Sequence, residues 1–179
     1  MGDDDLGALF EDLEQQALGM HLAERDAELA DRARGEYASV GFAGRVHASV
    51  GHRVTLTLRG GDLVEGVLAQ AGADWCTVVG SGAVPWLVRL DAVVAVSGLS
   101  SRAVPEAARP ALARLGFGAA LHRLAEETPE LLLHLDAGPA VRVRVSRIGA
   151  DFVEVEKADA PVSGPVLLPF AGVRVARPG

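Results

Sequence analysis

The chain has 179 residues, of which 49% are hydrophobic, and it carries a formal net charge of −7. A chain of this length can bury one or two compact cores, and none of its apolar runs approaches the roughly 20 residues needed to cross a bilayer. Its first residues are acidic, whereas a secretory signal begins with basic residues. A single cysteine, Cys76, excludes an internal disulfide framework. We therefore expect a cytoplasmic protein that does not enter a membrane.

Residues 1–36 hold the negative charge of the chain. They carry eleven acidic and three basic side chains, a net charge of −8 that leaves +1 for the rest. Apolar residues recur every three or four positions from Leu6 to Met20, and no proline interrupts the segment before Ala38. This spacing predicts a long N-terminal amphipathic helix in an acidic arm, residues 1–38. Such a helix packs along the rest of the chain, pairs with a second copy of itself or stays a solvated surface helix, and the sequence leaves these alternatives open.

The rest of the chain contains an internal repeat. Residues 54–79 align without a gap on residues 131–156, at a constant offset of 77. In both copies apolar residues alternate with polar ones, as in a strand with one buried face. Turn chemistry, in which a carboxylate accepts backbone N–H groups, explains the repeated aspartates without catalysis. The retained turn and corner residues, which we interpret as structural, are Gly61, Gly72, Asp74 and Trp75 in the first copy and Gly138, Gly149, Asp151 and Phe152 in the second.

Each copy is predicted to contain one helix followed by five strands. In the first copy a helix over 41–49 precedes strands over 54–58, 63–70, 75–79, 86–90 and 92–96. In the second copy a helix over 101–127, with a kink at Pro110, precedes strands over 131–135, 140–147, 152–156, 166–170 and 173–176. Five short strands joined by tight turns satisfy their edges by closing into a barrel. The sequence therefore predicts a mainly β protein with some α. Residues 39–98 form one small five-stranded barrel preceded by a helix, and residues 99–179 form a helix and a second barrel.

Each copy resembles an Sm-like domain, the family that includes the bacterial RNA chaperone Hfq. The resemblance rests on a helix, a five-stranded meander, a glycine turn and the segment Val64-Glu65-Gly66-Val67-Leu68, with an aspartate six residues on. Family members place a small residue where the second strand bends sharply, and Gly66 fits that need. The chain also resembles actinobacterial proteins that share its GADW signature. These resemblances imply Sm-like or SH3-like barrels.

The resemblance supports the fold more than an RNA site. RNA-binding members carry a polar base contact just after the aspartate and an arginine-glycine pair in the last two strands. This chain has Trp75-Cys76 and Leu90-Asp91-Ala92 at those places, and the bend glycine becomes Val143 in the second copy. Arginines and aromatic rings still make nucleic acid a candidate ligand. The candidate contacts are Arg59, Arg89, Arg142, Arg144, Arg147 and Arg174, with Trp75, Trp86 or Phe152 as stacking faces.

No motif predicts catalysis, a metal site or a cofactor. The five histidines, at positions 21, 47, 52, 122 and 134, are scattered, and none has a second ligand type at metal-binding spacing. The segments Gly60-Gly61 and Gly80-Ser81-Gly82 are hairpin signals, because neither is followed by the Lys and Ser or Thr of a phosphate-binding loop. We therefore expect a protein that is not an enzyme.

Two functions remain open from the sequence. The first is a non-enzymatic cytoplasmic scaffold or adaptor that acts through contacts with other proteins or with copies of itself. The second is an RNA- or DNA-binding regulator that uses the arginine-bearing faces. The acidic arm and the sequence pI of about 5.2 disfavour phosphate binding, so we prefer the first.

Overall fold

The computed structural model describes residues 25, 28–29, 31–32, 34–35, 37–158 and 164–179. The chain divides into two compact units, residues 1–40 and residues 41–179. In the first unit the described residues from 25 to 38 have helical backbone, and residues 6–24 of the predicted helix lie outside the described residues. Contrary to the prediction, the described residues contain no long N-terminal helix.

The second unit is mainly β and consists of two series of five strands. Its α-helices among the described residues are α2 (Phe42–His47) and α3 (Phe117–Glu127). The first series is β1 (Arg53–Leu58), β2 (Leu63–Ala71), β3 (Trp75–Val79), β4 (Pro85–Arg89) and β5 (Val93–Ser97). The second is β6 (Leu131–Leu135), β7 (Val141–Ile148), β8 (Phe152–Lys157), β9 (Val166–Pro169) and β10 (Val173–Pro178). We call α2 with β1–β5 the first half, and α3 with β6–β10 the second half.

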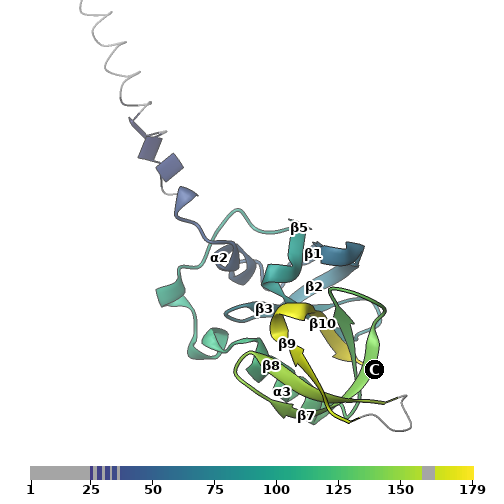
Figure 1. The fold of residues 1–179 in the computed structure, drawn as a ribbon. Helices are drawn as coiled ribbons and strands as arrows, with labels where there is room; N and C mark the ends of the chain where they lie inside the picture. Colours follow the sequence, from purple (N-terminus) through teal and green to yellow (C-terminus); the bar gives the residue numbers. More distant parts are fainter. Residues whose placement is uncertain (1–24, 26–27, 30, 33, 36, 159–163) are drawn as a thin grey trace, which may run out of the picture. The chain divides into compact units, whose positions relative to one another are not determined.

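All ten strands belong to one sheet with the order β5-β1-β2-β3-β4-β10-β6-β7-β8-β9 (Figure 1), and every pair in it is antiparallel. The two halves therefore have the same internal strand order. The prediction of two five-stranded Sm-like or SH3-like barrels is wrong, because the fourth and fifth strands of a half do not pair with each other. Instead β4 of the first half pairs with β10 of the second. The result is one open sheet whose outer strands are β5 and β9.

The strands form where apolar and polar residues alternate. In β1, Val54, Leu56 and Leu58 are buried, whereas Thr55 and Thr57 between them are only partly buried. An alternation of period two puts all apolar side chains on one face of a strand, so burial of that face stabilises the extended backbone. The ten strands expected from this pattern correspond to β1–β10, with ends displaced by a few residues at most.

The helix predicted over 101–127 is much shorter in the structure. Its first part contains only two short 3₁₀ turns, Glu106–Ala108 and Ala111–Arg114, and α3 begins at Phe117. Prolines cause the difference: a proline such as Pro110 has no N–H to donate and clashes with the preceding turn, so it interrupts a helix rather than kinking it mildly.

The two halves complete each other's cores. The core of the second half, around Phe117 and Leu133, includes Trp75 and Leu87 from the first half. The core of the first half includes Val175 from the second. Helix α3 packs against β7 and β10 of its own half and against β4 of the first half. Apolar burial therefore joins residues 41–179 into one unit.

Candidate functional site

The junction between the halves is the antiparallel pairing of β4 with β10. Val88 lies opposite Val175, and Leu87 lies opposite Ala176. Leu87 is 4% exposed, and the other three side chains are fully buried. Because backbone hydrogen bonds and apolar burial act together at this junction, it is a firm connection between the halves.

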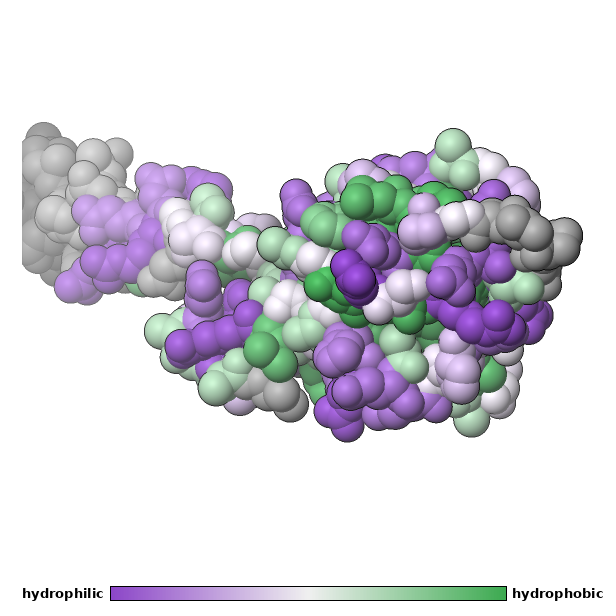
Figure 2. Space-filling view, turned by 60° about the horizontal axis from the view of Figure 1, so that its bottom comes forward, coloured by the Kyte–Doolittle hydropathy of each residue, from purple (hydrophilic) through white to green (hydrophobic). Residues whose placement is uncertain are grey.

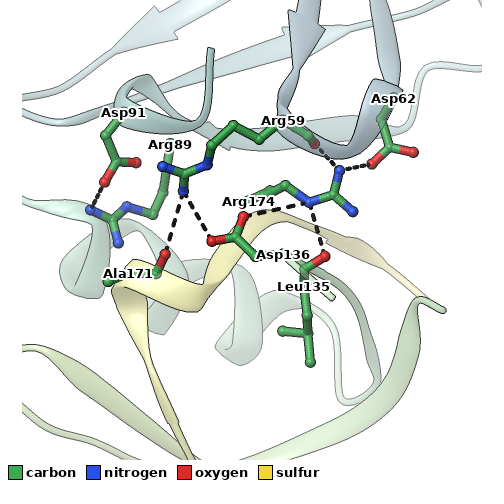
Figure 3. A network of polar contacts seen from close by, with 8 residues as sticks. All are labelled: Arg59, Asp62, Arg89, Asp91, Leu135, Asp136, Ala171 and Arg174. Carbon is green, nitrogen blue, oxygen red and sulfur yellow. Dashed lines mark hydrogen bonds and ion pairs between the residues drawn. The ribbon is translucent and has the colours of Figure 1, made fainter. Parts of the chain in front are cut away.

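A network of charged groups also joins the two halves (Figure 3). Arg174 on β10 is buried, and its Nη1 forms an ion pair with Oδ2 of Asp62, 2.7 Å away in the hairpin between β1 and β2. Its Nε donates to the carbonyl oxygen of Leu135 at 2.9 Å, and its Nη1 donates to the carbonyl oxygen of Arg59. The guanidinium of Arg174 is thus fixed by partners from both halves, as planar, multiply donating groups often are.

A second pair in this network links equivalent positions of the repeat. Arg59 Nη2 donates to Oδ2 of Asp136 at 3.3 Å and lies 3.4 Å from the carbonyl oxygen of Ala171. Next to it, Gly60 has a φ of +82°, and a Cβ at this position would overlap the guanidinium of Arg174. The glycine is therefore needed both for the left-handed backbone and for the close approach of the arginine.

The arginines proposed from sequence as nucleic-acid contacts are mostly paired with acidic side chains. Five of the six form ion pairs, and Arg147 is exposed with no polar partner among the described residues. The pairs are Arg59 with Asp136, Arg89 with Asp91, Arg142 and Arg144 with Glu130, and Arg174 with Asp62. Phosphate would have to compete with these carboxylates, so the geometry does not favour the proposed contacts.

The aromatic rings proposed as stacking faces are also largely covered. Trp75 is 8% exposed. The Trp86 ring lies 5.5 Å from the ring of His134, and the guanidinium of Arg177 lies 5.0 Å above it. Phe152 is half-buried. The two tryptophans thus contribute mainly to packing between the halves.

The repeated Gly-Ala-Asp-aromatic corner has a physical explanation. We call residues 72–75 the first corner and residues 149–152 the second corner. A Cβ on Gly72 would overlap the indole ring of Trp75, and a Cβ on Gly149 would overlap the ring of Phe152. In each corner the glycine N–H also donates to the carbonyl oxygen of the aromatic residue, at 2.8 Å and 2.9 Å. The aromatic ring therefore folds back onto a position that only glycine can occupy.

The first corner binds the chain that leads into α3. Asp74 Oδ1 accepts the backbone N–H of Phe117 at 2.7 Å. The indole N–H of Trp75 donates to the carbonyl oxygen of Leu115 at 2.8 Å, and the N–H of Ala73 donates to the same oxygen at 3.2 Å. The aspartate accepts a backbone N–H, as expected, but from the other half and not from its own turn. A charged acceptor makes this bond stronger than a neutral one.

The remaining structural glycines lie at turns or close approaches. Gly61 and Gly138 have φ values of +89° and +82° in the hairpins after β1 and β6. A Cβ on Gly66 would meet the backbone of Val79, at the end of β3. In the second half Val143 takes this place and is fully buried.

The outer strands β5 and β9 carry apolar residues that match the buried junction. Aligned by the repeat, Leu167 of β9 corresponds to Leu87 of β4, and Ala95 of β5 corresponds to Val175 of β10. Leu167 is 54% exposed, whereas Leu87 is 4% exposed. Ala95 is exposed, whereas Val175 is fully buried.

Among the described residues β5 pairs only with β1, and β9 pairs only with β8. Figure 2 shows exposed hydrophobic residues between hydrophilic ones on one face of the molecule. The open edges are candidates for contacts with other chains.

A groove of about 270 Å³ lies between the first half and α3. Its lining is mainly apolar and includes Trp75, Leu87 and Leu124. Its charged side chains, Arg123 and Glu127, form an ion pair at 3.2 Å along α3. No histidine or cysteine lines the groove.

Burial changes the pKa of three side chains in the second unit. Burial is the main cause that lowers the pKa of His47, whose Nε2 lies 3.0 Å from the carbonyl oxygen of Gly72. Burial also lowers the pKa of His134, against the opposing effect of Asp62. Burial raises the pKa of the Cys76 thiol to about 12, so the thiol is neutral.

Two further properties concern the described part of the chain alone. It contains no group of three or more His, Cys, Asp or Glu side chains that could hold a metal ion. Its helices are all too short or too polar to span a bilayer.

Sequence reasoning missed the junction and the charge network, although one signal was present. The repeat places an arginine, Arg59, and an aspartate, Asp136, at equivalent positions 77 residues apart. Opposite charges at equivalent positions of a repeat suggest that the two copies meet at that point. The pairing of Arg174 with Asp62 has no such signal, because Asp62 corresponds to a proline in the second copy.

Comparisons with protein-family models, with curated proteins and with solved structures gave no match. The candidate site is therefore defined by the geometry of this chain. It consists of the buried β4–β10 junction and of the open edges β9 and β5, which are the repeat equivalents of β4 and β10.

Proposed function

We propose that the chain is a non-enzymatic cytoplasmic scaffold that acts through protein contacts, including self-association, at the edges β5 and β9. The observation that carries the proposal is the contrast between Leu87, 4% exposed at the junction, and its counterpart Leu167, 54% exposed at the open edge. An apolar edge strand offers unpaired backbone groups and apolar side chains to a strand of another chain. Addition of a strand to such an edge is called β-augmentation.

The two open edges suit each other. Within the chain a fourth strand, β4, pairs with a fifth strand, β10. The open edges are again a fourth strand, β9, and a fifth strand, β5. A contact between β9 of one copy and β5 of the next is heterologous, so it can repeat from copy to copy. This arrangement supports a scaffold that displays several copies of one unit.

Sedimentation velocity over a range of concentrations tests the proposal. The wild-type chain, 18.6 kDa as a monomer, is expected to form larger species as concentration rises. Leu167→Lys places a charge at the β9 edge and is expected to leave a monomer. Leu63→Lys makes the same change at a residue that is 66% exposed on β2, away from both edges, and should behave as wild type.

Three results would count against this function. A wild-type chain that stays monomeric at every concentration would remove self-association. Equal effects of the two lysine substitutions would remove the edges from the mechanism. A ratio of absorbance at 260 nm to that at 280 nm that falls after nuclease treatment or in high salt would favour the nucleic-acid alternative, because phosphate contacts weaken as salt rises.

A further inference from the structure

The second corner, residues 149–152, has the same backbone structure as the first corner but, among the described residues, binds no segment equivalent to the one that leads into α3. Its backbone repeats that of the first corner. The carbonyl oxygen of Asp151 accepts the N–H of Phe170 at 2.8 Å, just as that of Asp74 accepts the N–H of Leu90 at 2.9 Å. However, Asp151 is exposed, and its carboxylate has no partner among the described residues. The second corner is therefore built like the first and lacks the segment that the first one binds.

The segment that fits such a corner is present at the start of the first half. Gly41 has φ −76° and ψ 148°, close to the −78° and 172° of Gly116. The carbonyl oxygen of Gly41 accepts the N–H groups of the third and fourth residues after it at 3.0 Å and 3.4 Å, and that of Gly116 does so at 3.1 Å and 3.4 Å. The local backbone is thus nearly the same.

The surroundings of the two segments differ. The N–H of Phe117 is bound to Asp74, and the Phe117 side chain is 1% exposed. The N–H of Phe42 has no partner among the described residues, and the Phe42 side chain is 40% exposed. Aromatic side chains are enriched at contact surfaces between proteins.

We infer that the second corner of one copy binds the Gly41–Phe42 segment of a second copy, with the Asp151 carboxylate accepting the N–H of Phe42. This inference rests on the proposed self-association and identifies its contacts. Pairing of β9 with β5 in the register of the junction sets Leu167 opposite Val96 and Leu168 opposite Ala95. It also brings the second corner to Phe42, as the junction brings the first corner to Phe117.

Two differences make the proposed contact between the second corner and Phe42 weaker than the contact between the first corner and Phe117. Phe152 lacks the indole N–H with which Trp75 binds the Leu115 carbonyl oxygen. Arg89, whose guanidinium lies 5.6 Å from the Phe117 ring, corresponds to Pro169, which provides apolar contact without a charge. The contact between copies is therefore reversible, whereas the junction is permanent.

Complementation between two variants tests the inference. Asp151→Ala removes the acceptor of the second corner and keeps Phe42, whereas Phe42→Ala removes the ring and keeps the corner. Each variant alone is expected to bind itself about tenfold or more weakly than wild type, because Asp151→Ala loses a hydrogen bond to a charged group and Phe42→Ala loses the burial of an aromatic ring. An equimolar mixture is expected to recover one wild-type contact and to form a 1:1 complex whose two free ends carry only the weakened contact. Glu106→Ala and Val50→Ala, which change an exposed acid and an exposed apolar residue elsewhere, are matched controls.

The outcomes separate this inference from the function on which it rests. Sedimentation velocity of the full-length chains, with thermal unfolding to verify that each variant is folded, gives the dissociation constants. If wild type associates, Leu167→Lys abolishes association and both corner variants bind as wild type, the edge contact stands and the corner inference is overturned. A mixture no tighter than either variant alone also overturns it. A monomeric wild type overturns both proposals.

Discussion

His47 illustrates how burial of one side chain makes stability depend on pH. It is half-buried in α2, its ring nitrogen Nε2 faces the carbonyl oxygen of Gly72, and burial lowers its pKa from the usual 6.5. The unfolded chain therefore binds a proton near pH 6.5 that the folded chain takes up only at lower pH. Its contribution to stability is complete above about pH 6.5 and is lost as pH falls toward the lowered pKa of the folded state. The lowered pKa of His134 acts in the same direction.

We predict that His47→Gln reduces the loss of stability on acidification. Glutamine keeps an N–H donor for the Gly72 carbonyl oxygen but does not bind a proton in this range. Urea unfolding at about pH 7.5 and about pH 5.5 measures the difference. His122→Gln, on the exposed face of α3, is the matched control for the substitution itself. An unchanged pH dependence in His47→Gln would contradict the assigned role.

At the scale of elements, the β4–β10 junction depends on the buried Arg174. The side chain of Arg174 is 7% exposed, and that of its partner Asp62 is 33% exposed. Removal of the guanidinium leaves the Asp62 carboxylate and two backbone carbonyl oxygens without their donor. Loss of one member of a buried pair is costly because the remaining charge stays poorly solvated.

Arg174→Met is therefore expected to lower the free energy of unfolding by about 2 kcal/mol or more, less than for a fully buried pair because Asp62 reaches water. Arg144→Met removes an arginine that is 55% exposed and paired with Glu130, and should cost about 1 kcal/mol at most. Chemical denaturation of the two variants makes the comparison. Equal losses would show that burial does not set the strength of the Arg174 pair.

The elements also show which parts of the fold were predictable. The strands follow from local alternation, as in Val54, Leu56 and Leu58, because a half-buried strand requires period two. The choice of partner for β4 is not local: the same alternation suits closure within a half and pairing with β10. The helix expected over 101–127 begins only at Phe117, because Pro110 has no N–H to donate and interrupts a helix.

The candidate site was predictable in part for the same reason. The Gly-Ala-Asp-aromatic corner was visible as a repeat, since close packing of Trp75 on Gly72 requires both residues. Its role in binding Phe117 was not visible, because the contact spans 43 residues and uses a backbone N–H that any residue can supply. The arginines were visible, but their acidic partners come from other elements.

At the scale of the whole molecule, the two outer strands of the sheet are the repeat equivalents of the two strands that pair at its centre. The junction joins a fourth strand to a fifth, and the sheet stops at one strand of each kind, β9 and β5. Leu167 on β9 and Val94 on β5 are 54% and 66% exposed. Natural proteins usually cover or charge such edges, so two apolar and complementary edges on one chain favour the proposal that copies join end to end.

Amide hydrogen exchange as a function of protein concentration tests this claim most directly. We predict that the outward-facing amides of β5 and β9, and the N–H of Phe42, exchange more slowly as concentration rises. Those of β4 and β10 should remain equally protected throughout, because the junction forms within one chain. If protection of β5 and β9 does not change while the chain associates, another surface joins the copies and the central claim is contradicted.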